Sequence, residues 1–133
     1  MTHPNEEVVR AYMAAVGEYL ETGGRGDPGA IRARLADDVV FHIGGNNALS
    51  GDFRGPDEAI GWLRTVVERP DRPVDSEMHD FLVSDDHVVV LVQRTIAGVR
   101  APAVVIYHVA DGKITEAWLH EAKQAEIDAA IGP

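Results

Sequence analysis

The stretch from Ser76 to Glu121 constrains the fold most, because almost all of it has the composition of β-strands. Val, Ile, Leu and aromatic residues dominate it, and turn signals interrupt it at Asp85-Asp86 and Asp111-Gly112. The second of these signals is typical of a tight hairpin. Val88–Val92 is apolar on both faces, as in a strand that is covered on both sides. The pattern predicts an antiparallel meander of four strands, at Ser76–Ser84, His87–Ile96, Ala101–Ala110 and Lys113–Glu121.

The first part of the chain has helical periodicity instead. Apolar residues recur at helical spacing over Asn5–Thr22, with Asn5 as the expected cap and Gly23-Gly24 as the stop. Tyr12 and Tyr19 are seven residues apart, so both lie at or near the buried face of this helix. The other expected elements are a short helix at Ala30–Leu35, a strand at Val39–Ile43, a helix at Gly55–Glu68 and a last helix at Lys123–Ile131.

This order of elements predicts an α+β fold. Three N-terminal helices would pack on one face of a curved antiparallel sheet, giving a cone-shaped α+β barrel with an internal pocket. Pockets of this kind usually hold small molecules. A length of 133 residues fits one domain, which we place at residues 1–133.

Charge and composition argue against several classes of partner. The 22 acidic and 12 basic side chains give a net charge of −10, which would repel nucleic acids and anionic membranes. Without cysteine there is no disulfide and no thiolate chemistry. The N-terminal residues do not resemble a secretion signal, and the longest apolar run is too short for a membrane span, so we expect a cytoplasmic protein.

Two histidines are candidate proton-transfer groups. His42 follows Val40 by two residues in its strand and could act as a base if it faced the pocket; the alternative is a core histidine bonded to a backbone carbonyl. His120 shares a strand face with Trp118, and Glu116 falls on the same face, where it could orient an imidazole. The alternatives are an exposed imidazole and a solvated carboxylate.

The other candidate residues would bind or polarise a ligand. A phenol donated into an apolar pocket can stabilise a developing oxyanion, which suits Tyr12 and, less directly, Tyr19. The alternative for both is plain aromatic packing. The remaining candidates for substrate binding are Asn46, Asp52, Trp62, His79, Gln93, Tyr107 and Trp118.

A metal site is not predicted. The chain has six histidines, but none are spaced His-x-His or His-x-x-x-His.

Five segments, taken in order, resemble the SnoaL-like branch of the NTF2-like superfamily, which also includes ketosteroid isomerase. The resemblance covers nearly the whole chain. The segments are Val8–Tyr12, Leu35–His42, Leu49–Gly55, His79–His87 and Asp111–Trp118. It implies a small-molecule pocket, acid–base chemistry without a cofactor, and activities such as isomerisation, aldol cyclisation, dehydration or epoxide hydrolysis. The resemblance, together with the two-faced apolar run Val88–Val92, also predicts a homodimer formed through the open face of the sheet.

The family's catalytic groups carry over only in part. Tyr12 matches the oxyanion-hole tyrosine of ketosteroid isomerase, but Ile43 and Val105 stand where that enzyme has its catalytic acids. Lys123 stands where SnoaL-like cyclases often have an acidic residue. Steroid isomerisation is therefore not predicted, and a base would have to come from elsewhere in the chain.

Two functional hypotheses follow. The first is a cofactor-independent enzyme for an apolar carbonyl or epoxide substrate, with His42 or His120 as base and Tyr12 as oxyanion donor. The second is a non-catalytic module of the same fold that binds a small ligand or dimerises. The two hypotheses differ in whether His42, Tyr12 and His120 point into one cavity.

Overall fold

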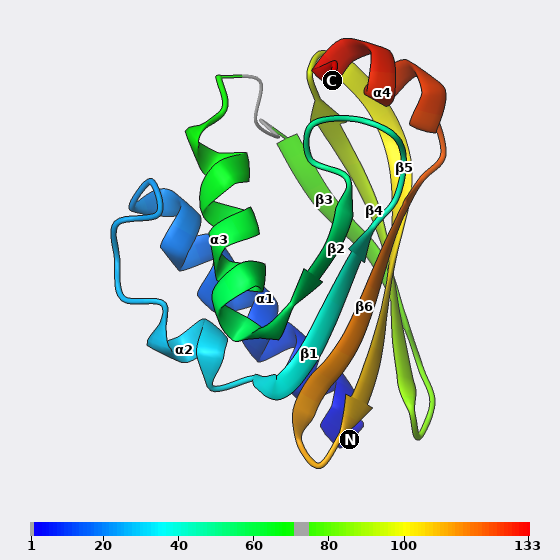
Figure 1. Ribbon diagram of the computed structural model, residues 1–133. Coiled ribbons are helices and arrows are strands. Elements are labelled where there is room, and N and C mark those ends of the chain that lie inside the picture. The colour runs from blue at the N-terminus through cyan, green and yellow to red at the C-terminus, as the bar shows by residue number, and fades with distance from the viewer. Residues whose placement is uncertain (1, 71–74) are drawn as a thin grey trace.

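The computed structural model describes residues 2–70 and 75–133, which form four helices and six strands within these ranges (Figure 1). Most predicted boundaries agree with it to within two residues. In chain order the elements are α1 (Pro4–Glu21), α2 (Gly29–Arg32), β1 (Leu35–Ile43), β2 (Gly51–Arg54), α3 (Gly55–Glu68), β3 (Asp75–Val83), β4 (His87–Ile96), β5 (Val99–Ala110), β6 (Lys113–Glu121) and α4 (Gln124–Ile131).

The strands form one curved sheet in the order β2-β1-β6-β5-β4-β3. The predicted meander is confirmed, because β3 to β6 pair antiparallel with their neighbours in sequence. Two details differ from the prediction. β1 pairs with β6 in parallel, and the short strand β2 forms where no strand was predicted. The sheet is therefore mixed, while the predicted α+β cone fold is confirmed.

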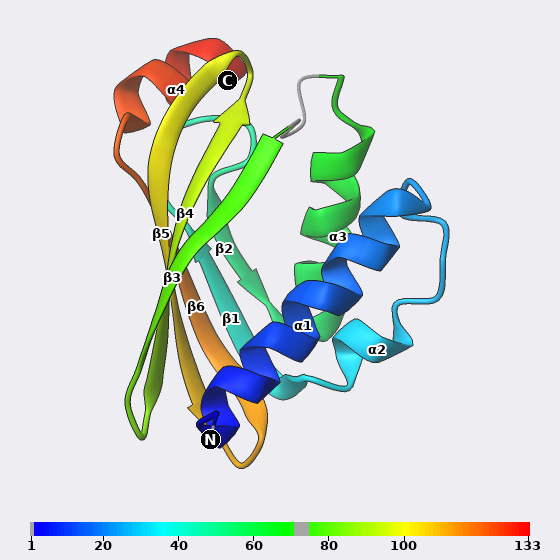
Figure 2. The ribbon, with the colours of Figure 1, turned by 180° about the vertical axis from the view of Figure 1, so that it is seen from behind.

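Helices α1, α2 and α3 all lie on the concave side of the sheet, and α4 lies across one end of it (Figures 1 and 2). The buried residues of α1 follow the helical spacing seen in the sequence and pack into the main core. α3 does the same with Ala59, Ile60 and Leu63, while Val66 belongs to a smaller cluster with Leu49, Ile96 and Ile127. The core thus lies between the helices and the concave face.

The start of α1 differs from the sequence-based expectation. His3, and not Asn5, is the capping residue, and its Nδ1 atom accepts a hydrogen bond from the backbone N–H of Asn5 at 3.1 Å. The Asn5 side chain instead donates to the backbone oxygens of Ser84 and Asp85. Asn5 therefore ties the start of α1 to the β3–β4 turn.

The predicted tight hairpin at Asp111-Gly112 is confirmed. Both residues have positive φ angles, 53° and 75°, which two-residue hairpin turns of this type require. The β4–β5 connection has the same form at Ala97 and Gly98, with φ angles of 52° and 80°. Alanine rarely adopts this conformation, which explains why the sequence did not reveal the second turn.

Strand β3 contains a bulge at His79, which shifts the pairing register between Met78 and Asp80. Met78 pairs with Val92, and Phe81 pairs with Val90, both of which are buried residues of β4. The extra residue therefore keeps both Met78 and Phe81 on the concave face.

The convex face of the sheet is left uncovered by the helices (Figures 1 and 2). Alternation along β4 buries Val88, Val90 and Val92 on the concave side and leaves Val89 and Leu91 half-buried on the other. Within residues 2–70 and 75–133, no helix has the length and hydropathy to cross a membrane.

Candidate functional site

A cavity of about 340 Å³ lies between α1, α3 and the concave face of the sheet. This volume is at the small end of the range for ligand sites. Its walls are mainly apolar side chains, including Phe41, Leu63, Val92 and Leu119, and Tyr12, Tyr107 and Arg94 are the principal polar groups on them. The predicted internal pocket is therefore present, and we call it the main chamber.

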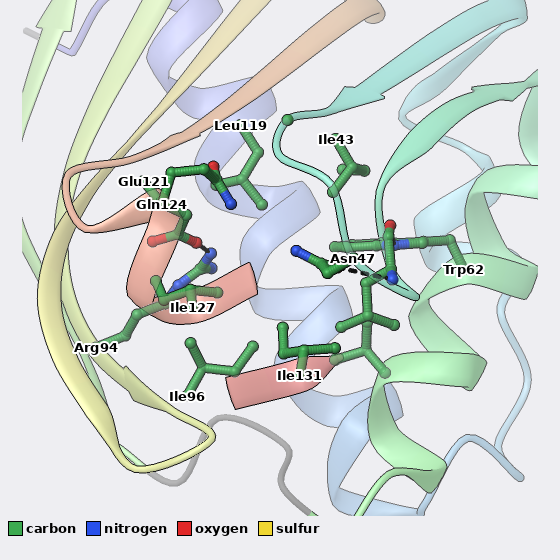
Figure 3. A pocket seen from close by; sticks show the side chains of 13 residues that line it. Ile43, Asn47, Trp62, Arg94, Ile96, Leu119, Glu121, Gln124, Ile127 and Ile131 are labelled. Carbon is green, nitrogen blue, oxygen red and sulfur yellow. Dashed lines mark hydrogen bonds and ion pairs between the residues drawn. The ribbon is translucent and has the colours of Figure 1, made fainter. Parts of the chain in front are cut away.

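A smaller chamber of about 40 Å³ adjoins it beneath α4 (Figure 3). Ile96, Glu121, Ile127 and Ile131 are among the residues that line only this end chamber. Four residues line both chambers and so form the boundary between them: Ile43, Trp62, Arg94 and Leu119.

Trp62 is held in place at this boundary. Its Nε1 atom donates a hydrogen bond to the backbone oxygen of Leu49 at 3.0 Å, and Phe53 packs against its ring. Asn47 fixes the same loop by donating to Asp128 of α4 at 2.7 Å. Gly45 has a φ angle of 90°, which favours glycine, and a Cβ atom there would displace the Gln124 side chain, whose Nε2 atom would be 2.2 Å away.

Tyr12 and Tyr107 place two phenol groups in the main chamber, with ring centroids 5.9 Å apart. Both side chains are buried, with 4% and 5% of their surface exposed. Neither hydroxyl has a hydrogen-bond partner among the described residues, and neither is among the fully buried side-chain atoms that lack one, so both hydroxyls are open to the chamber. The two phenols are therefore free to donate to a bound molecule.

Burial also keeps both phenols protonated. Desolvation raises the pKa of Tyr12 well above its ordinary value, and the nearby Tyr107 raises it further. Desolvation likewise raises the pKa of Tyr107, although the positive charge of Arg94 partly opposes this. At neutral pH each group is a hydrogen-bond donor, as an oxyanion-stabilising role requires.

Arg94 and Glu121 form an ion pair at the boundary between the chambers (Figure 3). The exposed fractions of the two side chains are only 16% and 6%. Desolvation lowers the pKa of the Arg94 guanidinium, which stays charged at neutral pH. The Nε atom of Arg94 and the Oε2 atom of Glu121 are buried without a hydrogen-bond partner. These are the two charged residues among those that line either chamber in the described part of the chain.

The sequence analysis missed this pair, although a signal was present. Arg94 falls on the same face of β4 as Val88, Val90, Val92 and Ile96, all of which are buried. A charged residue on a buried strand face is unusual and is a marker of a functional site. Gln93, which the sequence analysis chose as a binding residue, lies on the other face of β4. It pairs with Glu77 of β3 and Pro102 of β5.

Ile43 and Val105 both line the main chamber. These are the positions where the resemblance places the acids of ketosteroid isomerase. The cavity therefore has apolar side chains at both positions, and a base would have to come from elsewhere. Among the described residues that line either chamber, Glu121 is the one carboxylate.

The expectation that His42 faces the pocket is wrong. Phe41 and Ile43 line the chamber, so the intervening His42 points to the convex face of the sheet. Its ring stacks on Trp118 with centroids 5.6 Å apart and an interplanar angle of 18°. Trp118 therefore faces outward as well, between the cavity residues Ala117 and Leu119.

Outside the cavity, His42 is clamped between two carboxylates. Its Nδ1 lies 2.8 Å from Oδ1 of Asp52, and its Nε2 lies 2.6 Å from Oε2 of Glu116. Carboxylates accept hydrogen bonds, so this geometry is satisfied when both ring nitrogens carry a proton. Partial burial alone would lower the pKa of His42, but the hydrogen bonds and charges of Glu116 and Asp52 outweigh it and raise the pKa. Glu116 thus contacts an imidazole, but it is the imidazole of His42 on the convex face and not that of His120, beside which the sequence analysis placed it.

The raised pKa predicts how His42 affects stability. The His42 imidazole keeps its proton to a higher pH in the folded state than in the unfolded state. Its contribution to the free energy of unfolding is therefore complete below about pH 6.5 and is lost as the pH rises through the pKa of the folded state. We expect the difference in free energy of unfolding between the wild type and His42→Gln to shrink as the pH rises through that window, measured by urea unfolding. A difference that grows with pH would contradict this.

Other predicted site residues also lie away from the chambers. Tyr19 is buried, and its hydroxyl accepts hydrogen bonds from Arg64. His120 shares the outer face with Trp118 and is exposed; Asn46 and His79 are exposed too. Three of the predicted residues do come together around the main chamber: Tyr12, Trp62 and Tyr107.

The described residues contain no group of three metal-ligating side chains that could hold a metal ion. His42 with its two carboxylates is accordingly a charge network. The chemistry available to the chambers is that of hydroxyl donors and one ion pair.

The mouth of the main chamber includes Gly17 of α1 and Met78 of β3, both of which are exposed. A Cβ atom at Gly17 would meet nothing within 4 Å. We expect Gly17→Phe to slow ligand association by partly closing this mouth, as measured by stopped-flow fluorescence. Gly17→Ala is the matched control and should only stabilise the helix, by about 1 kcal/mol. Equal association rates in both variants would place the mouth elsewhere.

Comparisons with known proteins agree with this geometry. The SnoaL-like domain family model matches residues 9–117. The structure is similar to Bal32a from a soil-derived mobile gene cassette, with a TM-score of 0.78 at 16% identity over 97% of each chain. It is also similar to a protein of unknown function with a cystatin-like fold from Xanthomonas campestris, with a TM-score of 0.70 at 26% identity over 92% of this chain and 98% of the other.

A third similar structure is an NTF2-like protein from Burkholderia xenovorans LB400, with a TM-score of 0.73 at 20% identity over 99% of this chain and 98% of the other. No curated protein sequence matches the chain. The family match extends over most of the sequence, from α1 to β6. The chain therefore belongs to the SnoaL-like domain family, and its fold is similar to that of an NTF2-like protein.

Proposed function

We propose that this protein is a cofactor-independent enzyme that carries out acid–base chemistry on an apolar carbonyl or epoxide substrate, by isomerisation, cyclisation, dehydration or hydrolysis. The observation that carries the proposal is the pair of phenols, Tyr12 and Tyr107, whose hydroxyls open into a mainly apolar chamber and have no protein partner among the described residues. Such hydroxyls can donate hydrogen bonds to an oxygen atom of a bound ligand.

In the proposed reaction, Glu121 takes the place of His42 and His120 as the base. It is the one carboxylate among the described residues that line either chamber, and Arg94 holds it in position. For a carbonyl substrate, Glu121 removes a proton from the carbon beside the carbonyl, and the electron pair moves to the carbonyl oxygen. That oxygen accepts hydrogen bonds from the phenols. Return of the proton to the same carbon completes a hydrogen exchange, and its return to the far carbon of an adjoining double bond completes an isomerisation.

Proton exchange tests this chemistry without knowledge of the natural substrate. In D₂O, the protein should accelerate deuterium uptake at the methylene carbon of phenylacetone, followed by NMR, and Glu121→Gln should abolish the acceleration. Lys123→Gln is the control, because Lys123 is exposed at the start of α4. Binding of phenylacetone without exchange would reject the catalytic proposal.

The second candidate function is a non-catalytic ligand-binding or dimerisation module. It is favoured by Ile43 and Val105, which leave the cavity without an acid at the positions that the resemblance assigns to catalysis. Under this hypothesis the Arg94–Glu121 pair serves binding alone.

We also propose that a second copy of the chain is a partner, docked on the convex face of the sheet. Half-buried apolar side chains from β4 and β5, including Val89, Leu91, Val104 and Ile106, lie there without a covering helix. We expect a dimer in sedimentation equilibrium at micromolar concentration and a monomer for Leu91→Glu. Glu18→Lys is the control, because Glu18 is exposed on α1, which lies on the concave side of the sheet, and a monomeric wild type would contradict the proposal.

A further inference from the structure

Two histidines on the convex face of the sheet, His87 of β4 and His108 of β5, lie side by side and line neither chamber. We propose that they bind a divalent transition-metal ion, with Zn²⁺ as its representative, through one ring nitrogen each. Water molecules would fill the remaining positions around the ion. The helices leave this face uncovered (Figures 1 and 2), so the site is separate from the proposed reaction.

Strand pairing brings the two side chains together. His87 pairs with His108, and their neighbours Val88 and Val109 are buried on the concave side, so both histidines point to the convex face. The backbone N–H of Val109 donates to the backbone oxygen of Asp86. The next pair along, which the two histidines form, is therefore of the type without hydrogen bonds, in which opposite side chains are closest.

The spacing of the two rings suits a shared ion. Their centroids are 5.1 Å apart, with an interplanar angle of 72°. Two imidazoles that bind one ion in tetrahedral geometry, at nitrogen–metal distances of about 2.0–2.1 Å, have centroids about 5 Å apart. The rings of His87 and His108 are thus spaced as in a pair that ligates one metal ion.

Thr115 prepares His108 to act as a ligand. Its hydroxyl donates a hydrogen bond to the backbone oxygen of His108 at 3.3 Å, so the same hydroxyl accepts one from Nδ1 of the imidazole, 2.5 Å away. The ring proton therefore lies on Nδ1, and the lone pair of Nε2 is left for a metal ion. Metal-binding histidines nearly always have such an outer partner on the other ring nitrogen.

The neighbouring groups define a site with two protein ligands. His87 is exposed, and its ring has no hydrogen-bond partner among the described residues. Glu116 pairs with His108 on the other side, but its carboxylate contacts the imidazole of His42. No group of three metal-ligating side chains occurs in residues 2–70 and 75–133. Imidazole suits Zn²⁺, whereas Mg²⁺ and Ca²⁺ prefer oxygen ligands.

The sequence does not reveal this pair, because the two histidines come from different strands. No His-x-His or His-x-x-x-His spacing marks them. Only the register of β4 against β5 places them opposite each other.

Isothermal titration calorimetry with Zn²⁺ alone, at about pH 7.5 so that imidazoles are mostly neutral, tests the site. We expect one Zn²⁺ per chain. Thr115→Val removes only the outer partner and should weaken binding about tenfold, whereas His87→Gln and His108→Gln should each weaken it at least about a hundredfold. His120→Gln should bind as the wild type does, because His120 is exposed on the same face but pairs with Val104. Excess Mg²⁺ should not compete.

Several results would overturn the inference. One is a wild type that does not bind Zn²⁺, and another is unchanged affinity in His87→Gln, which alters an exposed side chain and leaves the core intact. Loss of binding in His42→Gln, with binding kept in His108→Gln, would place the ion at the carboxylates around His42 instead. A stoichiometry of half an ion per chain would mean that two copies share the ion, contrary to a site within one chain.

Discussion

Replacing Arg94 by methionine is expected to destabilise the protein by about 3–5 kcal/mol, the usual cost of leaving one member of a buried ion pair without its partner. The Glu121 side chain is 94% buried, since only 6% of it is exposed. Without the guanidinium, its carboxylate would lie among Ile96, Leu119 and Ile127, which cannot solvate it. Urea unfolding at pH 7, followed by circular dichroism, measures the loss.

The matched control is the double variant Arg94→Met with Glu121→Leu. Removing both charges also removes the desolvation penalty of the pair, so we expect stability within about 1 kcal/mol of the wild type, or above it. A double variant as unstable as Arg94→Met would mean that the pair itself supports the fold. The predicted combination, a costly single change and a harmless double change, would show that the pair is present for reasons other than stability.

Tyr12→Phe is expected to lower the rate of proton exchange on phenylacetone by about a hundredfold, the usual effect of removing one donor that stabilises an oxyanion. The same change should leave the free energy of unfolding unchanged or slightly higher. The hydroxyl of Tyr12 is open to the chamber and has no protein partner among the described residues, so its removal breaks no contact there. Exchange rates by NMR and urea unfolding measure the two effects.

Tyr19→Phe is the control on the same helix and should show the opposite pattern. The Tyr19 hydroxyl accepts hydrogen bonds from Nε and Nη2 of Arg64 at 3.1 and 2.8 Å, and Tyr19 lines neither chamber. We expect it to lose about 1 kcal/mol of stability and to keep the exchange rate. If Tyr12→Phe keeps full exchange activity, Tyr12 has no part in the reaction.

Local sequence signals were sufficient for most of the fold. Helical spacing located α1 and α3, and strand composition with two turn signals located β3 to β6. Two features depend on pairing between distant segments and leave no local signal: the parallel contact of β1 with β6, and the short strand β2. Strand alternation also correctly grouped residues by face, as Glu116 and Trp118 lie on the same face as His42.

Alternation alone did not tell which face turns inward. In β1, either His42 or its neighbours Phe41 and Ile43 had to face the cavity. The helices cover the face that carries Phe41 and Ile43, so His42 faces outward. For Arg94 the error had a different cause. The sequence analysis chose the amide of Gln93, which lies on the outer face of β4. The guanidinium of Arg94 is more unusual, because it lies on the same strand face as buried valines.

The single-residue bulge at His79 determines which side chains of β3 border the entrance to the cavity. Met78 and Phe81 both lie opposite inward-facing residues of β4, Val92 and Val90, because His79 is an extra residue between them. If His79 were paired regularly with Val92, Met78 would turn outward and Glu77 would turn inward. One unpaired residue thus keeps a carboxylate out of the entrance and a thioether in it.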